Sequence, residues 1–296
     1  MAGLGVNRSQ DLRLWFTGKV ATLRYVVADV FTDVPLAGNQ LAVFTDAREI
    51  PEEQLQPLAA ELKLSETVFV YPPSAEGHVR IRIFTPSLEV PFAGHPILGT
   101  AFVLAGPLQL DEIRLECGAG VVPVRLERDG SRIAFGWMTQ PPFSHEPYPE
   151  ADALLALLGV EAAQSPVELY RQGPQHVVVE LASPEAVGAL RPDFGALEAL
   201  SPYGTACIAR DGDAWKARVF VPAHGVPEDP ATGSAAGPIA LHLARHGRVA
   251  FGEEIEIRQG TEIGRPSTLH AVARSETDIE VGGSAVVVAR GEFRLP

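Results

Sequence analysis

Two stretches of the chain each deliver a polar side chain from a glycine turn. The segment PFAGHPILGTAFVLA aligns without a gap with PATGSAAGPIALHLA, so that Gly94 corresponds to Gly233 and His95 to Ser234. A glycine turn that leads into an apolar helix leaves backbone N–H groups unpaired, with the positive end of the helix dipole behind them. Two such turns that face each other across a cleft would hold a carboxylate between them.

The alignment is part of an internal repeat of domain size. Gly94 and Gly233 are 139 residues apart (233 − 94), and the prolines of the upstream sequences IFTP and VFVP, Pro86 and Pro222, are 136 apart (222 − 86). A chance match of small residues is the alternative. Repetition at nearly constant spacing favours two similar halves, each with one of the two helices.

The repeat and a proline-rich segment, TQPPFSHEPYPE, together predict a domain boundary. We expect an N-terminal extension over residues 1–20, an N-terminal domain over 21–138 and a C-terminal domain over 139–296. Whether the last strand returns to the N-terminal domain is left open. In a chain of 296 residues, two domains of ordinary size can each bury a core.

Strand signals dominate the chain. Short runs rich in Val, Ile, Phe and Leu, many with alternating apolar and polar residues as in VRIRIF, recur between turn residues. Helical patterns interrupt them at four places, namely residues 51–64, 95–106, 149–160 and 233–247. The second and fourth are apolar nearly all round, which predicts buried helices with the strands wrapped around them.

Composition excludes several classes of protein. Hydrophobic residues make up 46% and charged residues 21%, as in soluble globular proteins, and a net charge of −13 without a Lys/Arg cluster argues against nucleic-acid binding. No apolar run is long enough for a membrane helix, and the first residues carry charges where a signal peptide is apolar. The two cysteines are far apart and suit a reducing compartment. We expect a cytoplasmic protein with no nucleic-acid or membrane partner.

Five motifs, in order along the chain, resemble those of the PhzF-like isomerases, a family named for phenazine biosynthesis. They are DVFTDVPLAGNQLAVF, LSETVFV, FTPSLEVPFAGHPILGTAFVL, EDPATGSAAGPIALHL and RQGTEIGRPSTL, and they span nearly the whole chain after residue 20. The resemblance implies a diaminopimelate-epimerase-like α+β fold with two similar domains, each a curved, barrel-like antiparallel β-sheet wrapped around a central buried helix. It also implies an active site between the domains, and a homodimer.

The resemblance further implies a cofactor-independent isomerase that moves a proton between carbons of a small carboxylate-bearing substrate. Glu66, in the SET motif, inherits the role of the general acid/base. The groups that would position and polarise the substrate are His95, Asp229 and Ser234, and the substrate-binding positions are Gly94, Gly233 and Asn39. One carboxylate with a pKa raised by burial can remove and return a proton, while amides and hydroxyls stabilise the developing charge. Neither a metal nor an organic cofactor is needed.

Each assignment has a structural alternative. Glu66 could simply start a strand, Asp229 could open a turn, and Ser234 could be a helix N-cap. His95 could be a helix-start residue bonded to the backbone. One departure from the family pattern is also visible: Gln40 stands where the motif Gly-Asn-Pro is expected, which leaves the shape of that loop open.

A non-catalytic binding protein on the same fold and an amino-acid racemase or epimerase are the alternative functions. The joint presence of the four candidate catalytic residues favours an enzyme. A cysteine-dependent racemase is disfavoured, because the turns that would carry its two thiols hold His95 and Ser234 instead. Cys117 and Cys207 are therefore expected to be ordinary buried residues.

Two further motifs resemble known functional patterns but lack part of each pattern. His242 and His246 have the i, i+4 spacing of a metal pair but lack the glutamate of H-E-x-x-H, so no metal site is expected. Ser234 does not lie in a G-x-S-x-G sequence, which disfavours a hydrolase nucleophile.

Overall fold

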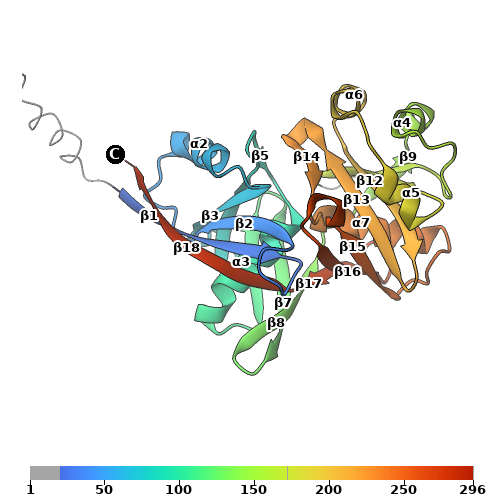
Figure 1. The fold of residues 1–296 in the computed structure, drawn as a ribbon. Helices are drawn as coiled ribbons and strands as arrows, with labels where there is room; N and C mark the ends of the chain where they lie inside the picture. The colour runs from blue at the N-terminus through green and yellow to red at the C-terminus, as the bar shows by residue number, and fades with distance from the viewer. Residues whose placement is uncertain (1–20, 172, 296) are drawn as a thin grey trace, which may run out of the picture.

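The computed structural model describes residues 21–171 and 173–295, which form a sheet-dominated mixed α/β fold (Figure 1). Its 18 described strands belong to one hydrogen-bonded sheet. The strands are β1 (Ala21–Val30), β2 (Asn39–Phe44), β3 (Glu66–Tyr71), β4 (Val79–Phe84), β5 (Glu89–Val90), β6 (Glu112–Cys117), β7 (Gly120–Asp129), β8 (Arg132–Thr139), β9 (Ser144–Pro147), β10 (Glu168–Arg171), β11 (Gln175–Glu180), β12 (Gly204–Asp211), β13 (Ala214–Val221), β14 (Val226–Asp229), β15 (Glu254–Gln259), β16 (Ser267–Ala273), β17 (Ile279–Gly283) and β18 (Ala285–Leu295). The described residues also form the helices α2 (Glu52–Leu62), α3 (Gly94–Leu108), α4 (Ala151–Leu158), α5 (Pro184–Ala189), α6 (Phe194–Leu200) and α7 (Gly233–Arg245), and the 3₁₀ turns η1 (Pro222–His224) and η2 (Thr261–Ile263).

All four predicted helices are present, as α2, α3, α4 and α7. Helices α5 and α6 are not predicted by the sequence pattern. Both carry N-cap signals, because the side chains of Ser183 and Asp193 accept hydrogen bonds from the N–H groups of Ala186 and Ala196. With only 6 and 7 residues, these helices are too short to display a helical hydrophobic pattern.

Two further expectations concern the N-terminal extension and membrane-spanning helices. The predicted N-terminal extension, residues 1–20, lies outside the described residues. Within the part of the chain that the structure describes, no helix has the length and apolar character needed to cross a membrane.

The pairing of the strands repeats between the two halves of the chain. In the first half β2 pairs in parallel with β3, and β4 with β6; in the second half β11 pairs in parallel with β12, and β13 with β15. Each half continues with an antiparallel meander, β6–β7–β8 and β15–β16–β17. The repeat seen in the sequence therefore extends to the order and direction of the strands.

The expectation of antiparallel sheets is confirmed only in part, because these four pairs are parallel while the other pairs of described strands are antiparallel. At least one helix separates the two strands of each pair along the chain: α2 between β2 and β3, α3 between β4 and β6, α5 and α6 between β11 and β12, and α7 between β13 and β15. A crossover of this kind brings the chain back to its starting end, so that the second strand runs in the same direction as the first. The resulting sheet is mixed.

Among the described strands, two pairings join the two halves. β8 pairs with β17 in antiparallel fashion, with Gly136 opposite Gly283. β18 pairs antiparallel with β1, from Val30 opposite Ala285 to Ala21 opposite Leu295 (Figure 1). The last strand of the chain therefore lies beside the first, in the sheet of the first half.

The apolar helices α3 and α7 each pack against several strands of one half. α3 packs against β1, β2, β6 and β8, and α7 packs against β11, β16 and β17. The largest hydrophobic cluster of described residues includes Ile97 and Leu98 of α3 and Ile239 and Leu243 of α7, so one core reaches through both halves. Smaller clusters lie under α2 and under the group α4, α5 and α6.

The N-termini of α3 and α7 meet at two glycines. A methyl group on Gly94 would lie 2.5 Å from the carbonyl carbon of Gly233, and one on Gly233 would lie 3.0 Å from the carbonyl carbon of Gly94. Any side chain at these positions would collide with backbone, so glycine is required for the close approach. The two glycine turns thus contact each other directly, whereas the repeat suggested turns that face each other across a cleft.

We expect Gly94→Ala to push the two helix starts apart and to lower the free energy of unfolding by about 1–3 kcal/mol, the usual cost of overpacking. Gly106→Ala is the matched control, because Gly106 lies in the same helix and a methyl group there would have no neighbour within 4 Å. The control should be neutral or stabilising, since alanine is the better helix former. Urea denaturation measures both effects, and equal stability of the two variants would contradict the tight contact.

Candidate active site

A cavity of about 240 Å³ lies where the two halves meet. Its wall includes Glu66 and Phe92 from the first half and His176, Asp229 and Ser234 from the second. Among the described residues that line it there is neither lysine nor arginine. Its polar side chains are instead hydroxyls, carboxyls and imidazoles, namely those of Ser65, Thr85, Thr232, Ser234, Glu66, Glu89, Asp229, His176 and His224.

Glu66 begins β3, where it lies opposite Leu41 of β2. Its side chain is 17% exposed, and its Oε2 lies 3.2 Å from Nδ1 of His95. Burial, and then the negative charge of Asp229, raise the pKa of the Glu66 carboxyl well above its ordinary value. A raised pKa suits a group that exchanges protons near neutral pH, although the catalytic role itself stays a prediction.

A buried hydrogen-bond network holds Asp229. Asn39 Nδ2 donates to Asp229 Oδ1 (2.9 Å) and to the carbonyl oxygen of Ala231 (3.0 Å). The Thr232 hydroxyl donates to Asp229 Oδ2 (2.7 Å), and Gln259 Nε2 donates in turn to that hydroxyl (2.9 Å). Burial raises the pKa of Asp229 to about 6, although the hydrogen bonds from Thr232 and Asn39 oppose the rise. Both carboxyl oxygens of Asp229 therefore accept side-chain hydrogen bonds, which is more than an aspartate needs to start a turn.

Asn39 and His95 lie behind the two carboxyl groups. Both side chains are buried, and neither belongs to the cavity wall. Nδ1 of His95 lies 3.3 Å from Asn39 Nδ2. Burial lowers the pKa of His95 to about 3, so its imidazole is neutral near pH 7. These contacts make Asn39 a support for Asp229, and its direct contact with substrate stays a prediction.

The starts of α3 and α7 carry no side-chain caps. The N-cap residues are Ala93 and Thr232, and neither side chain bonds to its own helix. The first N–H groups of the two helices, at Gly94 and Gly233, are therefore not capped by a side chain. Neither glycine lines the cavity, whose wall contains their neighbours Ala93, Thr232 and Ser234, so the role of Gly94 and Gly233 in substrate binding stays a prediction. The alternative that Ser234 is an N-cap is wrong, because Thr232 occupies that position.

His176, which is not among the residues predicted from the sequence, lines the cavity beside Ser234. Its side chain is buried, and its Nε2 lies 3.0 Å from Ser234 Oγ. Burial lowers the pKa of His176 to about 3. The repeat contains the signal, because aligning GNQLAV with GPQHVV puts His176 where the first half has the apolar Leu41. An imidazole at a core position of a strand needs a polar partner, and Ser234 supplies it.

Gln40, which stands where the family pattern has proline, lies in β2 opposite Asp29 of β1. The loop before it is held without proline. Gly38 has a positive φ of 68°, which glycine adopts without strain, and Arg265 Nε donates to its carbonyl oxygen (2.9 Å). Arg265 Nη2 also donates to Asp29 Oδ1 (2.7 Å). An arginine of the second half thus fixes the loop that presents Asn39.

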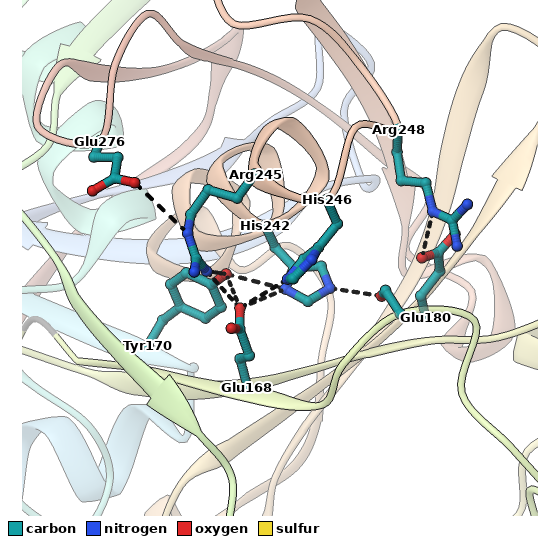
Figure 2. Close-up of polar contacts among 9 residues, drawn as sticks. Glu168, Tyr170, Glu180, His242, Arg245, His246, Arg248 and Glu276 are labelled. Carbon is teal, nitrogen blue, oxygen red and sulfur yellow. Dashed lines mark hydrogen bonds and ion pairs between the residues drawn. The ribbon is translucent and has the colours of Figure 1, made fainter.

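Figure 2 shows a second buried polar cluster, in which side chains from the C-terminal part of α7 surround Glu168. Glu168, His242 and His246 offer three possible metal-ligating atoms within 4.8 Å of one another. The carboxylate is already occupied, because its Oε2 accepts hydrogen bonds from Arg245 Nη1 (2.6 Å) and from the Tyr170 hydroxyl (2.8 Å). A metal ion would have to displace the arginine cation. We therefore interpret the cluster as an ion-pair network that ties α7 to β10.

The raised pKa of Glu66 predicts a pH-dependent gain of stability for Glu66→Gln. Folding favours the protonated carboxyl, so its contribution to stability is complete below the ordinary pKa of 4.5 and is lost as the pH rises through the folded value. The advantage of the variant over wild type should therefore grow between about pH 5 and about pH 8. Urea denaturation at both pH values measures it, with Glu112→Gln, on an exposed strand start, as the control. A difference that does not change with pH would contradict the burial of an ionisable Glu66.

Glu168 predicts the opposite dependence. Burial raises its pKa, but hydrogen bonds from the two histidines, Tyr170 and Arg245 outweigh burial and hold the pKa well below the ordinary 4.5. The ionised carboxylate therefore stabilises the fold above that value, and this contribution is lost progressively as the pH falls.

Glu168→Gln should accordingly cost about 3 kcal/mol near neutral pH, because it leaves the Arg245 cation without its buried partner. The cost should shrink in acid. Glu276→Gln is the control, because that carboxylate is 64% exposed and lies 3.9 Å from Arg245 Nε. Denaturation in urea across the acid range compares the two, and a loss for Glu168→Gln no larger than that of the control would rule out the network.

A family model described as phenazine biosynthesis-like protein (PhzC-PhzF) matches residues 28–291. The chain is 46% identical over 276 residues to the trans-2,3-dihydro-3-hydroxyanthranilate isomerase of Pseudomonas aeruginosa, with 92% of this chain and 99% of that protein covered. A solved structure of a predicted epimerase from Pseudomonas aeruginosa is 31% identical, with a TM-score of 0.80 over 92% of this chain and 99% of that one. A hydroxyproline epimerase from Agrobacterium vitis, 12% identical over 93% of both chains with a TM-score of 0.66, shares the fold alone. The chain therefore belongs to the phenazine biosynthesis-like (PhzC-PhzF) family and is an isomerase.

Proposed function

We propose that this isomerase moves a proton between two carbons of a small carboxylate-bearing substrate, with Glu66 as the group that removes and returns the proton. One observation carries the proposal: a buried carboxyl with a raised pKa lines a small cavity where two uncapped helix starts meet. The helix N–H groups would bind the substrate carboxylate, and the same donors would stabilise the charge that spreads into it when the proton leaves.

The names of the curated relatives suggest the substrate. Proteins 46% identical to this chain are named trans-2,3-dihydro-3-hydroxyanthranilate isomerase. That compound has a carboxylate conjugated with a partly reduced ring, so an allylic proton is acidified by delocalisation into the carboxylate. It also has an amino group, for which Asp229 is an acceptor within the same cavity wall. We propose this compound, or a close cyclic amino carboxylate, as the substrate.

The two halves differ at the position of Glu66, and the difference fits a reaction in which one group carries the proton. Glu66 begins β3 opposite Leu41, and Gly204 begins β12 opposite His176. The position equivalent to the glutamate therefore has no side chain. A racemase needs acid/base groups on both faces of its substrate, whereas a proton shift along one face needs one group.

The two cysteines do not replace the missing group. Neither Cys117 nor Cys207 lines the cavity. Burial raises the pKa of both thiols, that of Cys207 to about 12, so neither is poised to form a thiolate. This favours the isomerase over a cysteine-dependent racemase.

His95, Asp229 and Ser234 would hold the substrate and the proton carrier in register, as the family resemblance implies. Two similar domains that each wrap a sheet around α3 or α7, with the division near residue 139, are part of the same proposal. Independence from cofactors, a homodimer and a cytoplasmic location remain predictions.

The test is conversion of trans-2,3-dihydro-3-hydroxyanthranilate in D₂O by wild type, Glu66→Gln and the control Glu112→Gln, followed by chromatographic retention and mass. Wild type and the control should convert the compound, while Glu66→Gln should lose a factor of about 10³ in kcat, as for loss of a general acid/base. Retention is followed because a proton returned internally changes the isomer without adding deuterium.

Three outcomes separate the possibilities. Wild-type kcat in Glu66→Gln would refute the role of the glutamate. Failure on this compound with conversion of another component of a metabolite extract would reject the substrate and keep the reaction class. Failure on both would favour the non-catalytic binding protein.

A further inference from the structure

We propose that His176 is a positioning residue that makes the Ser234 hydroxyl a hydrogen-bond donor to the substrate. The inference rests on the proposed function, because it concerns the same cavity. His176 is not among the site residues that the family resemblance implies.

The position of His176 is set by two strands. It lies in β11 directly opposite Gly204 of β12, and its side chain is 2% exposed. A methyl group on residue 204 would lie 2.5 Å from Nδ1 of the imidazole, so the glycine makes room for the ring. The ring is thus held against the backbone on one side, while Nε2 points to Ser234 Oγ at 3.0 Å.

The hydrogen-bond partners of Nδ1 and Nε2 indicate which of the two nitrogens carries the proton. A neutral imidazole has one N–H, and burial keeps His176 neutral near pH 7 by lowering its pKa to about 3. Nδ1 has no hydrogen-bond partner among the described residues. A buried N–H without an acceptor is rarer in proteins than an unpaired acceptor, so the proton belongs on Nε2. Nε2 then donates to Ser234 Oγ.

This direction determines what Ser234 can do. If Nε2 accepted, the serine proton would be consumed inside the protein, and the hydroxyl could only accept from the substrate. Because Nε2 donates, the serine O–H stays free. It lines the cavity at the start of α7, beside the uncapped N–H groups. A substrate carboxylate at the start of α7 would therefore meet a hydroxyl donor beside the helix N-terminus.

The repeat supports a specific role for the ring. The first half has Leu41 at the equivalent strand position, opposite Glu66. The second half therefore has a glycine in place of the acid and an imidazole in place of the leucine. The space that a second acid would fill is occupied by a ring that serves Ser234.

Two variants test the assignment by steady-state kinetics on the proposed substrate. His176→Leu, which copies the first half, should lower kcat/KM about tenfold, the usual effect of losing one hydrogen bond. His176→Gln should restore much of it, because the glutamine amide also donates an N–H at similar reach. Thermal unfolding of both variants checks that they fold.

A double-mutant cycle separates positioning from a merely structural role. If His176 acts through Ser234, the loss in His176→Leu/Ser234→Ala should be no larger than in Ser234→Ala alone. Additive losses, or a His176→Gln variant as impaired as His176→Leu, would overturn the inference while leaving the isomerase intact.

Nitrogen-15 NMR of the histidine rings keeps the test independent of turnover. The His176 signals, assigned by their loss in His176→Gln, should show a neutral ring protonated on Nε2, and Ser234→Ala should shift that N–H. Protonation on Nδ1 would overturn the inference even if no substrate were converted. Lack of activity in wild type with the expected NMR signature would instead count against the proposed function alone.

Discussion

The contact between the backbones of Gly94 and Gly233 is the constraint on which the candidate site depends. It brings the positive ends of two helix dipoles together inside the protein, an arrangement that favours negative charge nearby. Glu66 and Asp229 lie in the adjoining cavity wall, and a carboxylate substrate would add to them. Because the helices meet through glycine, Ala93 at the start of one helix and Thr232 and Ser234 at the start of the other line the same small cavity.

The two halves share their topology but differ in chemistry at this point. The first half supplies Glu66, and the equivalent strand of the second half begins with Gly204. In the repeat, Asp229 corresponds to Val90 (229 − 139) and Thr232 to Ala93 (232 − 139). The acid network therefore belongs to one half and the proton-carrying candidate to the other. Such an asymmetric arrangement on a symmetric frame suits a reaction in which one face of the substrate is worked on.

The two ends of helix α7 lie beside buried carboxyl groups that have opposite effects on the stability of the fold. At its start, burial of Glu66 and Asp229 disfavours their charged forms and costs stability near neutral pH. Near its C-terminal end, Glu168 is surrounded by donors that favour its charge. Helix α7 thus starts beside two buried carboxyl groups that cost stability and is anchored near its other end by an ion-pair network that contributes stability.

The sequence by itself determined the repeat, the two apolar helices and the two glycine turns, and it pointed to Glu66, Asp229 and Ser234 of the cavity wall, because hydrophobic periodicity and turn chemistry are local and because five motifs stand in order. It did not determine strand direction: the parallel pairs follow from helical crossovers whose path a local pattern does not contain. His176 and the Asn39–Asp229–Thr232–Gln259 network also emerged only from the fold. Their importance lies in contacts between residues far apart in the chain. Such contacts, and the pKa shifts that burial imposes, are decided when the two halves close on each other.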